Sequence, residues 1–115
     1  MSTAPENNEP ATDYLSVLAE IRALLLRNGY DLQASFVDDA ATRLKAGESM
    51  GILTSNELWG GSGSVADCSP PGDDNREHCR LMSELSSLMV RDGIADRRVQ
   101  EKGFAFWYWV TNNKV

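Results

Sequence analysis

The sequence predicts a mainly α-helical fold: a small helical bundle of three long helices and short turns, with a C-terminal β-hairpin. Three segments repeat apolar residues at steps of three and four, which is the period of one buried helix face. The last segment is rich in aromatic residues without that period, which is typical of a strand. Because 115 residues suit a single core, we expect one domain over residues 12–115.

The first predicted helix follows a polar, proline-containing segment, residues 1–11, which we expect to be a disordered tail. Thr12 or Asp13 can begin the helix, because either side chain can cap free backbone N–H groups. Gly29 ends it, since glycine accepts the left-handed conformation that a helix C-cap needs. The buried stripe is predicted to contain Tyr14, Leu18, Ile21 and Leu25, with Val17 and Leu24 beside them.

The second predicted helix spans residues 31–45. Only a few residues link it to the first helix, so the two should pack as an antiparallel hairpin. Gly47 is the expected stop signal. Its buried stripe is predicted to contain Leu32, Phe36, Ala40 and Leu44, with Val37 and Ala41 beside them.

The third predicted long helix begins at Asp73 or Asp74 and runs to Asp92, with Gly93 after it. Carboxylates at its start favour the positive end of the helix dipole. The preceding residues 68–72 contain two prolines and a glycine, which interrupt any helix. Its buried stripe is predicted to contain His78, Met82, Leu85 and Met89, with Leu81 and Leu88 beside them.

The segment LWGGSGSVAD, residues 58–67, lies between the second and third long helices, and we call it the glycine corner. Capping-box spacings over residues 54–57 and 64–67 predict one short helical turn ending at Trp59 and another opening at Ser64. A phosphate-binding P-loop would need a lysine after Gly63, and a nucleophile elbow would need a glycine in place of Ser64. We therefore expect a structural corner made by Gly60, Gly61, Gly63 and Ser64.

The C-terminal segment, residues 96–110, is predicted to be a hairpin in which residues 96–100 pair with residues 104–110. The intervening Glu-Lys-Gly resembles a three-residue hairpin loop with glycine at the left-handed position. A helix is the alternative, because aromatic runs of this length are ambiguous. In a strand, alternate side chains would group Phe104, Phe106, Tyr108 and Val110 on one face and Ala105, Trp107 and Trp109 on the other.

The formal net charge of −6 is distributed unevenly along the chain. Residues 1–30 carry a net charge of −2, residues 31–74 carry −6, and the residues from 75 onward carry +2. An acidic chain is a poor match for nucleic acid, whose phosphates bind Lys and Arg, and for anionic lipid surfaces. It suits a protein partner with a basic surface. We therefore expect no nucleic-acid or membrane partner.

The sequence predicts no catalytic residue, no metal site and no cofactor. Cys68, His78 and Cys79 lack the spacing of zinc ligands, and His78 is the only histidine. No apolar run approaches the length of a membrane span, and the N-terminus lacks the pattern of a signal peptide. We therefore expect a cytoplasmic protein with two reduced thiols.

The glycine corner resembles a motif in a family of short bacterial proteins of unknown function. In that family an apolar or aromatic residue and then Gly-Gly-x-Gly-Ser-x-x-Asp stand between two helices rich in Leu and Ala. The resemblance covers residues 13–93 and implies no established catalytic activity; the chain departs from the pattern at residues 68–72 and in its aromatic C-terminus. The matching residues here are Trp59, Gly60, Gly61, Gly63, Ser64 and Asp67.

In size, charge and composition the chain resembles the immunity proteins with which bacteria block toxins from neighbouring cells. The leading hypothesis is a non-enzymatic immunity-type inhibitor that occludes a cognate toxin with an acidic surface. One alternative is a structural or regulatory protein that forms a homodimer through the C-terminal aromatic strand. Another is a small ligand-binding protein or enzyme that uses the glycine corner. The residues expected to contact a partner are Trp59, Asp67, Asp38, Asp39, Trp107 and Trp109.

Overall fold

The computed structural model describes the backbone of residues 4–112 and the side chains of residues 12–112. Within this part of the chain the regular structure is five α-helices and one 3₁₀-helix, without a strand. The predicted mainly α class is confirmed, whereas the predicted architecture of three long helices with a C-terminal β-hairpin is wrong. The elements are α1 (Ala4–Arg27), α2 (Asp31–Lys45), the 3₁₀-helix η1 (Met50–Thr54), α3 (Asn56–Trp59), α4 (Asp73–Arg91) and α5 (Arg97–Asn112).

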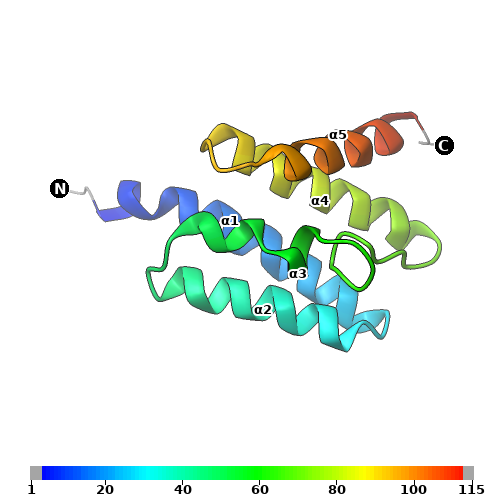
Figure 1. The fold of residues 1–115 in the computed structure, drawn as a ribbon. Helices are drawn as coiled ribbons and strands as arrows, with labels where there is room; N and C mark the ends of the chain where they lie inside the picture. The colour runs from blue at the N-terminus through cyan, green and yellow to red at the C-terminus, as the bar shows by residue number, and fades with distance from the viewer. Residues whose placement is uncertain (1–3, 113–115) are drawn as a thin grey trace.

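The four long helices form two antiparallel hairpins, α1 with α2 and α4 with α5 (Figure 1). The hairpins meet where α1 packs against α4, so α2 and α5 lie on opposite sides of this central pair. The short elements η1 and α3 contact α2, and α3 also contacts α5. The described chain therefore has its core along α1 and α4, and α2 and α5 each keep one face outward.

The stripe predicted for α1 is confirmed: all six of its residues are buried. Large apolar side chains at steps of three and four line up on one helix face, and that face meets both α2 and α4. The helix begins at Ala4, earlier than the expected start at Thr12 or Asp13. A helical turn does not need a buried face, so the capping side chains of Thr12 and Asp13 were a poor guide to the start. Residues 1–3 of the expected tail lie outside the described residues.

The bounds predicted for α2 are confirmed, but its predicted stripe is partly wrong. Leu32 is 61% exposed, and Ala34 is buried in its place. At about 100° per residue, Leu32 lies about 140° around the helix from the buried Val37. The face turned to α1 is therefore centred on smaller side chains than the sequence pattern indicates. Its buried residues are Ala34, Val37, Ala40 and Leu44.

The long helix α4 follows the prediction closely. It begins at Asp73 and ends at Arg91, one residue before the predicted Asp92. Its four stripe residues and Leu81 are fully or almost fully buried, whereas Leu88 is half-buried. Three serines extend the side of α4 that meets α5, and two of them, Ser83 and Ser86, are buried. Small side chains therefore line the contact between the two helices of this hairpin.

The predicted C-terminal hairpin is wrong, because residues 97–112 form the helix α5. Asp96 caps the helix: its side chain accepts a hydrogen bond from the backbone N–H of Val99 at 2.9 Å. Val99 and Gly103 are buried, and Phe106 and Val110 are half-buried at the same three- and four-residue spacing. The segment does carry a helical period, which starts before the aromatic run and continues through Gly103.

Candidate functional site

The outward side of α5 carries three exposed aromatic side chains, Phe104, Trp107 and Tyr108, which we call the aromatic face. These residues are three and four positions apart, so a helix brings them together. The ring centroid of Phe104 lies 6.0 Å from that of Trp107 and 6.2 Å from that of Tyr108. Their exposed fractions are 64%, 52% and 56%, respectively. The aromatic face is therefore a preassembled apolar surface in contact with solvent.

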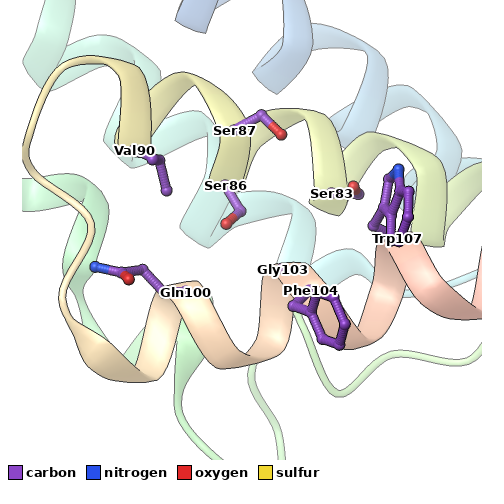
Figure 2. A pocket seen from close by; sticks show the side chains of 8 residues that line it. All are labelled: Ser83, Ser86, Ser87, Val90, Gln100, Gly103, Phe104 and Trp107. Carbon is purple, nitrogen blue, oxygen red and sulfur yellow. The ribbon is translucent and has the colours of Figure 1, made fainter.

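A groove of about 380 Å³ runs between α4 and α5 beside the aromatic face, and we call it the α4–α5 groove. Trp107 stands at the end of the groove where Ser83 lies, and Val90 and Gln100 stand at the other end (Figure 2). No charged side chain lines it. Its lining residues are Ser83, Ser86, Ser87, Val90, Gln100, Gly103, Phe104 and Trp107.

The floor of the groove depends on a close approach between Gly103 of α5 and Ser86 of α4. A Cβ atom on Gly103 would overlap the Ser86 side chain, so only glycine allows the two helices to pack at this distance. The Ser86 hydroxyl donates a hydrogen bond to the backbone carbonyl of Val99 at 3.2 Å, which satisfies this buried polar group. The α4–α5 hairpin is therefore tightly joined beneath an apolar surface.

The glycine corner and the short elements η1 and α3 support the inner side of α5. Lys102 Nζ donates a hydrogen bond to the Gly60 carbonyl of the corner at 3.0 Å, and Arg98 donates to the carbonyl of Thr54 in η1 at 2.5 Å. Arg98 also contacts the side-chain oxygen of Asn56 in α3. Together these contacts hold the helix that carries the aromatic face.

Inside the corner, Ser64 has the role of a turn residue. Its hydroxyl donates to the Gly60 carbonyl at 2.6 Å and accepts from the Asp67 backbone N–H at 3.2 Å, so a turn does open at Ser64. The Asp67 carboxylate accepts from the Gly63 N–H at 3.3 Å. The short helix α3 is capped by Ser55, whose side chain accepts from Leu58 N–H, rather than by the expected Thr54. Thr54 instead ends η1.

The glycines of the corner differ in what they need from the backbone. A Cβ atom on Gly60 would lie 2.5 Å from the Asn56 carbonyl oxygen, which leaves no room for a side chain. Gly63 has a φ of +88°, in the left-handed region that favours glycine. A Cβ atom on Gly61 would meet nothing within 4 Å. Gly60 and Gly63 therefore have a steric or conformational reason to be glycine, and Gly61 has no steric one.

The predicted contact residue Trp59 is fully buried in the core. Its indole N–H donates to the Leu53 carbonyl at 2.8 Å, which satisfies its only polar atom. A partner that meets the folded chain therefore cannot reach this side chain. Of the other two tryptophans among the predicted contacts, Trp107 belongs to the aromatic face and Trp109 is half-buried.

The predicted acidic contacts are exposed but stand apart from the aromatic face. Asp38 and Asp39 project from α2, where they form ion pairs with Arg22 at 3.5 Å and with Arg43 at 3.8 Å. Asp67 is exposed in the glycine corner. Because α2 and α5 lie on opposite sides of the molecule, the structure does not join the carboxylates of α2 and the aromatic residues into one site (Figure 1).

His78 and the two cysteines are buried and serve packing. His78 Nε2 donates to the Val65 carbonyl at 3.1 Å, and its ring meets the edge of Phe106 at 6.3 Å between centroids. Burial lowers the pKa of His78 below its usual value of 6.5. Burial also raises the pKa of Cys68 to about 11 and raises that of Cys79. Protonated, buried thiols are poor nucleophiles and poor metal ligands.

Across the described residues there is no group of three or more His, Cys, Asp or Glu side chains that could hold a metal ion. None of the described helices is long and apolar enough to cross a membrane. Comparison of the chain with protein-family models, curated proteins and solved structures found no match. The resemblance at the glycine corner therefore stays a prediction, and the site has to be interpreted from its own geometry.

Proposed function

We propose that the chain is a non-enzymatic protein-binding module that engages its partner through the aromatic face and the α4–α5 groove. The observation that carries this proposal is the cluster of Phe104, Trp107 and Tyr108, each more than half exposed beside an uncharged groove. The main exposed apolar patch of a soluble protein is often functional, and tryptophan and tyrosine are enriched among residues that dominate binding energy.

The shape of this surface favours a helical partner. The antiparallel helices α4 and α5 lie side by side and bound an uncharged groove whose exposed surface is mostly apolar, which is the arrangement that accepts the apolar side of an amphipathic helix. The close contact of Gly103 with Ser86 holds the walls together, so the groove does not have to form on binding. A preformed groove reduces the entropy that is lost when a partner docks.

The chemistry of the surface supports binding rather than catalysis. None of the residues that line the α4–α5 groove has an acidic, basic or thiol side chain. The buried His78 and Cys68 hydrogen-bond to backbone carbonyls of the glycine corner, at Val65 and Ser64. The hydroxyls of Ser83, Ser86 and Ser87 would need a general base beside them to act as nucleophiles, and none of the lining residues supplies one.

Photo-crosslinking in the native host tests this proposal. A photoreactive phenylalanine analogue at position 104 should give a discrete adduct, because Phe104 lies at the centre of the aromatic face. The same analogue at position 32 is the matched control, since Leu32 is equally exposed but lies on α2. An adduct from position 104 alone supports the proposal. No adduct, or the same adducts from both positions, would contradict it.

A second proposal keeps the chain among immunity-type inhibitors, with the acidic half of the molecule as the contact surface. The exposure of Asp38, Asp39 and Asp67 supports it, because exposed carboxylates accelerate association with a basic toxin surface. Binding to a co-purifying toxin should then weaken with added salt and in the double variant Asp38→Lys/Asp39→Lys. Binding that is insensitive to salt and to both substitutions contradicts this proposal.

A further inference from the structure

The negative charge of the molecule lies mostly outside the α4–α5 hairpin. Residues 1–72, which include α1, α2 and the glycine corner, carry a net charge of −6, whereas residues 73–112 carry −1. Two copies that met through the acidic part of the chain would bring like charges together, which is repulsive. Contact through α5 places the two α2 helices at opposite ends of the pair, since α2 and α5 lie on opposite sides of the molecule (Figure 1).

The centre of the aromatic face is uncharged. Residues 103–113 contain no charged side chain, and neither do the residues that line the α4–α5 groove. In a pair related by a two-fold axis, a residue near the axis faces its own copy, so any charge there would face a like charge. The aromatic face avoids this repulsion. The flanking charges Arg97 and Glu101 already pair with each other at 2.9 Å.

The same surface offers both a projection and a recess. Phe104 and Trp107 project from α5, and the groove of about 380 Å³ lies directly beside them. This volume exceeds the roughly 150 Å³ of a cavity that holds a benzene ring. A two-fold interface has to be self-complementary, with projection and recess on one surface of each copy. The α4–α5 hairpin carries both features on one side, with Phe104 and Trp107 beside the other side chains that line the groove (Figure 2).

We propose that the partner of the aromatic face is a second copy of this chain, which inserts aromatic side chains of its own α5 into the groove across a two-fold axis. This inference rests on the proposed function and names the partner of the same site. Each of the three aromatic side chains is more than half exposed. An aromatic side chain has a surface of roughly 150–250 Å², so the three together expose roughly 300 Å² per molecule. Two copies would bury roughly 600 Å² of aromatic surface, about half of what a small standard interface contains. The dimer is therefore weak and concentration-dependent.

Sedimentation equilibrium of the purified full chain, from micromolar to millimolar concentration, measures this association. The wild type should shift from the monomer mass to twice that mass. Trp107→Glu should raise the dissociation constant at least about tenfold, because it removes an aromatic anchor and places like charges near the axis. Phe104→Glu should do the same. Leu32→Glu is the matched control on α2 and should leave the dissociation constant unchanged.

The outcomes separate this inference from the proposed function. A wild type that stays monomeric overturns the inference, and so does a dimer that both Trp107→Glu and Phe104→Glu leave intact. Circular dichroism shows whether each variant keeps its helices, so a folding defect is not mistaken for lost association. The crosslinked adduct from position 104 distinguishes failure of this inference from failure of the proposed function. An adduct of twice the monomer mass supports self-pairing, whereas an adduct with another protein keeps the proposed function and overturns the second copy as partner.

Discussion

Gly103 of α5 lies against Ser86 of α4 so closely that a single methyl group on Gly103 would overlap the serine side chain. This contact joins the two helices whose outer surfaces carry the aromatic face and the α4–α5 groove. Glycine inside a helix lowers helix stability by about 1 kcal/mol relative to alanine. Its presence in the middle of α5 is therefore explained by packing and not by helix propensity.

Gly103→Ala should lower the free energy of unfolding by up to about 2 kcal/mol. Overpacking a close contact costs about 1–3 kcal/mol, and better helix propensity offsets about 1 kcal/mol of that. Rotation of the Ser86 side chain does not relieve the overlap, because the Ser86 Cβ atom is also too close. Urea denaturation measures the change. Ala105→Gln, on the exposed side of α5, is the control and should stay within about 0.5 kcal/mol of the wild type.

A double-mutant cycle tests the cause of that destabilisation. Ser86→Gly removes the atoms that the new methyl group would overlap, so Ser86→Gly and Gly103→Ala together should destabilise less than the sum of the single variants. Simple additivity would show that the effect of Gly103→Ala has another origin.

Gly60 and Gly61 are neighbours whose substitution by alanine should have different effects on the free energy of unfolding. Gly60→Ala should lower the free energy of unfolding by about 2 kcal/mol, because its Cβ atom would meet the Asn56 carbonyl, which belongs to the backbone and cannot rotate away. Gly61→Ala should be neutral or stabilise by up to about 1 kcal/mol, since its Cβ atom meets open space and alanine restricts the unfolded chain. Equal effects of the two substitutions in thermal unfolding contradict the close contact at Gly60.

Trp59→Phe should destabilise the fold without weakening association through the aromatic face. The substitution leaves the buried Leu53 carbonyl without its donor, which costs about 1–3 kcal/mol. Because Trp59 is fully buried, no partner surface changes. Chemical denaturation and sedimentation equilibrium of the same variant measure the two effects separately. Weaker association at unchanged stability would show that Trp59 does contribute to partner binding.

Sequence patterns predicted α1 and α4 well because their apolar side chains are large and regularly spaced. Tyr14, Leu18 and Ile21 can be buried on only one helix face, so periodicity determines which face turns inward. The pattern failed at Leu32, where two stripes were possible on α2 and packing selected the one with Ala34. That choice depends on how closely α1 and α2 approach, which the local sequence does not encode.

The C-terminal segment was predicted incorrectly because Gly103 resembled a hairpin glycine. Two local signals favoured the helix: Asp96 in a capping position and the spacing from Val99 through Gly103 to Phe106. The buried side of α5 packs against α4, where Gly103 meets Ser86, and this contact with a separate helix is visible only in the fold.

Because of the same error, the prediction placed the residues of the candidate site on two different faces. A strand places Phe104 and Tyr108 on one face and Trp107 on the other, whereas the helix groups all three. The contacts predicted from the sequence therefore include Trp107 and Trp109 but not Phe104 or Tyr108. It also missed the α4–α5 groove, since Val90 and Gln100 meet only through the packing of the two helices. Helical periodicity applied to the aromatic run would have found the three rings.

The stability of the fold should fall as the pH drops below about 6.5, because of His78. Its Nε2 donates to Val65, and its Nδ1 is buried without a hydrogen-bond partner in the described structure, so a proton added there would have no acceptor. Burial therefore holds the pKa of His78 below its usual 6.5 in the folded state, whereas the unfolded chain binds a proton near 6.5. Below that pH the unfolded chain binds a proton at His78 more readily than the folded chain does, which favours unfolding.

The slope reaches at most about 1.4 kcal/mol per pH unit for one proton, and stability is recovered as the pH rises through 6.5. Urea denaturation of the wild type and of His78→Gln between pH 5 and pH 8 measures it. His78→Gln has no titrating group at this position, so its stability should vary less with pH over the same range, whatever its stability at neutral pH. Parallel pH profiles for the two proteins would show that His78 is protonated equally in the folded and unfolded states, and that its buried Nδ1 is accessible to an acceptor after all.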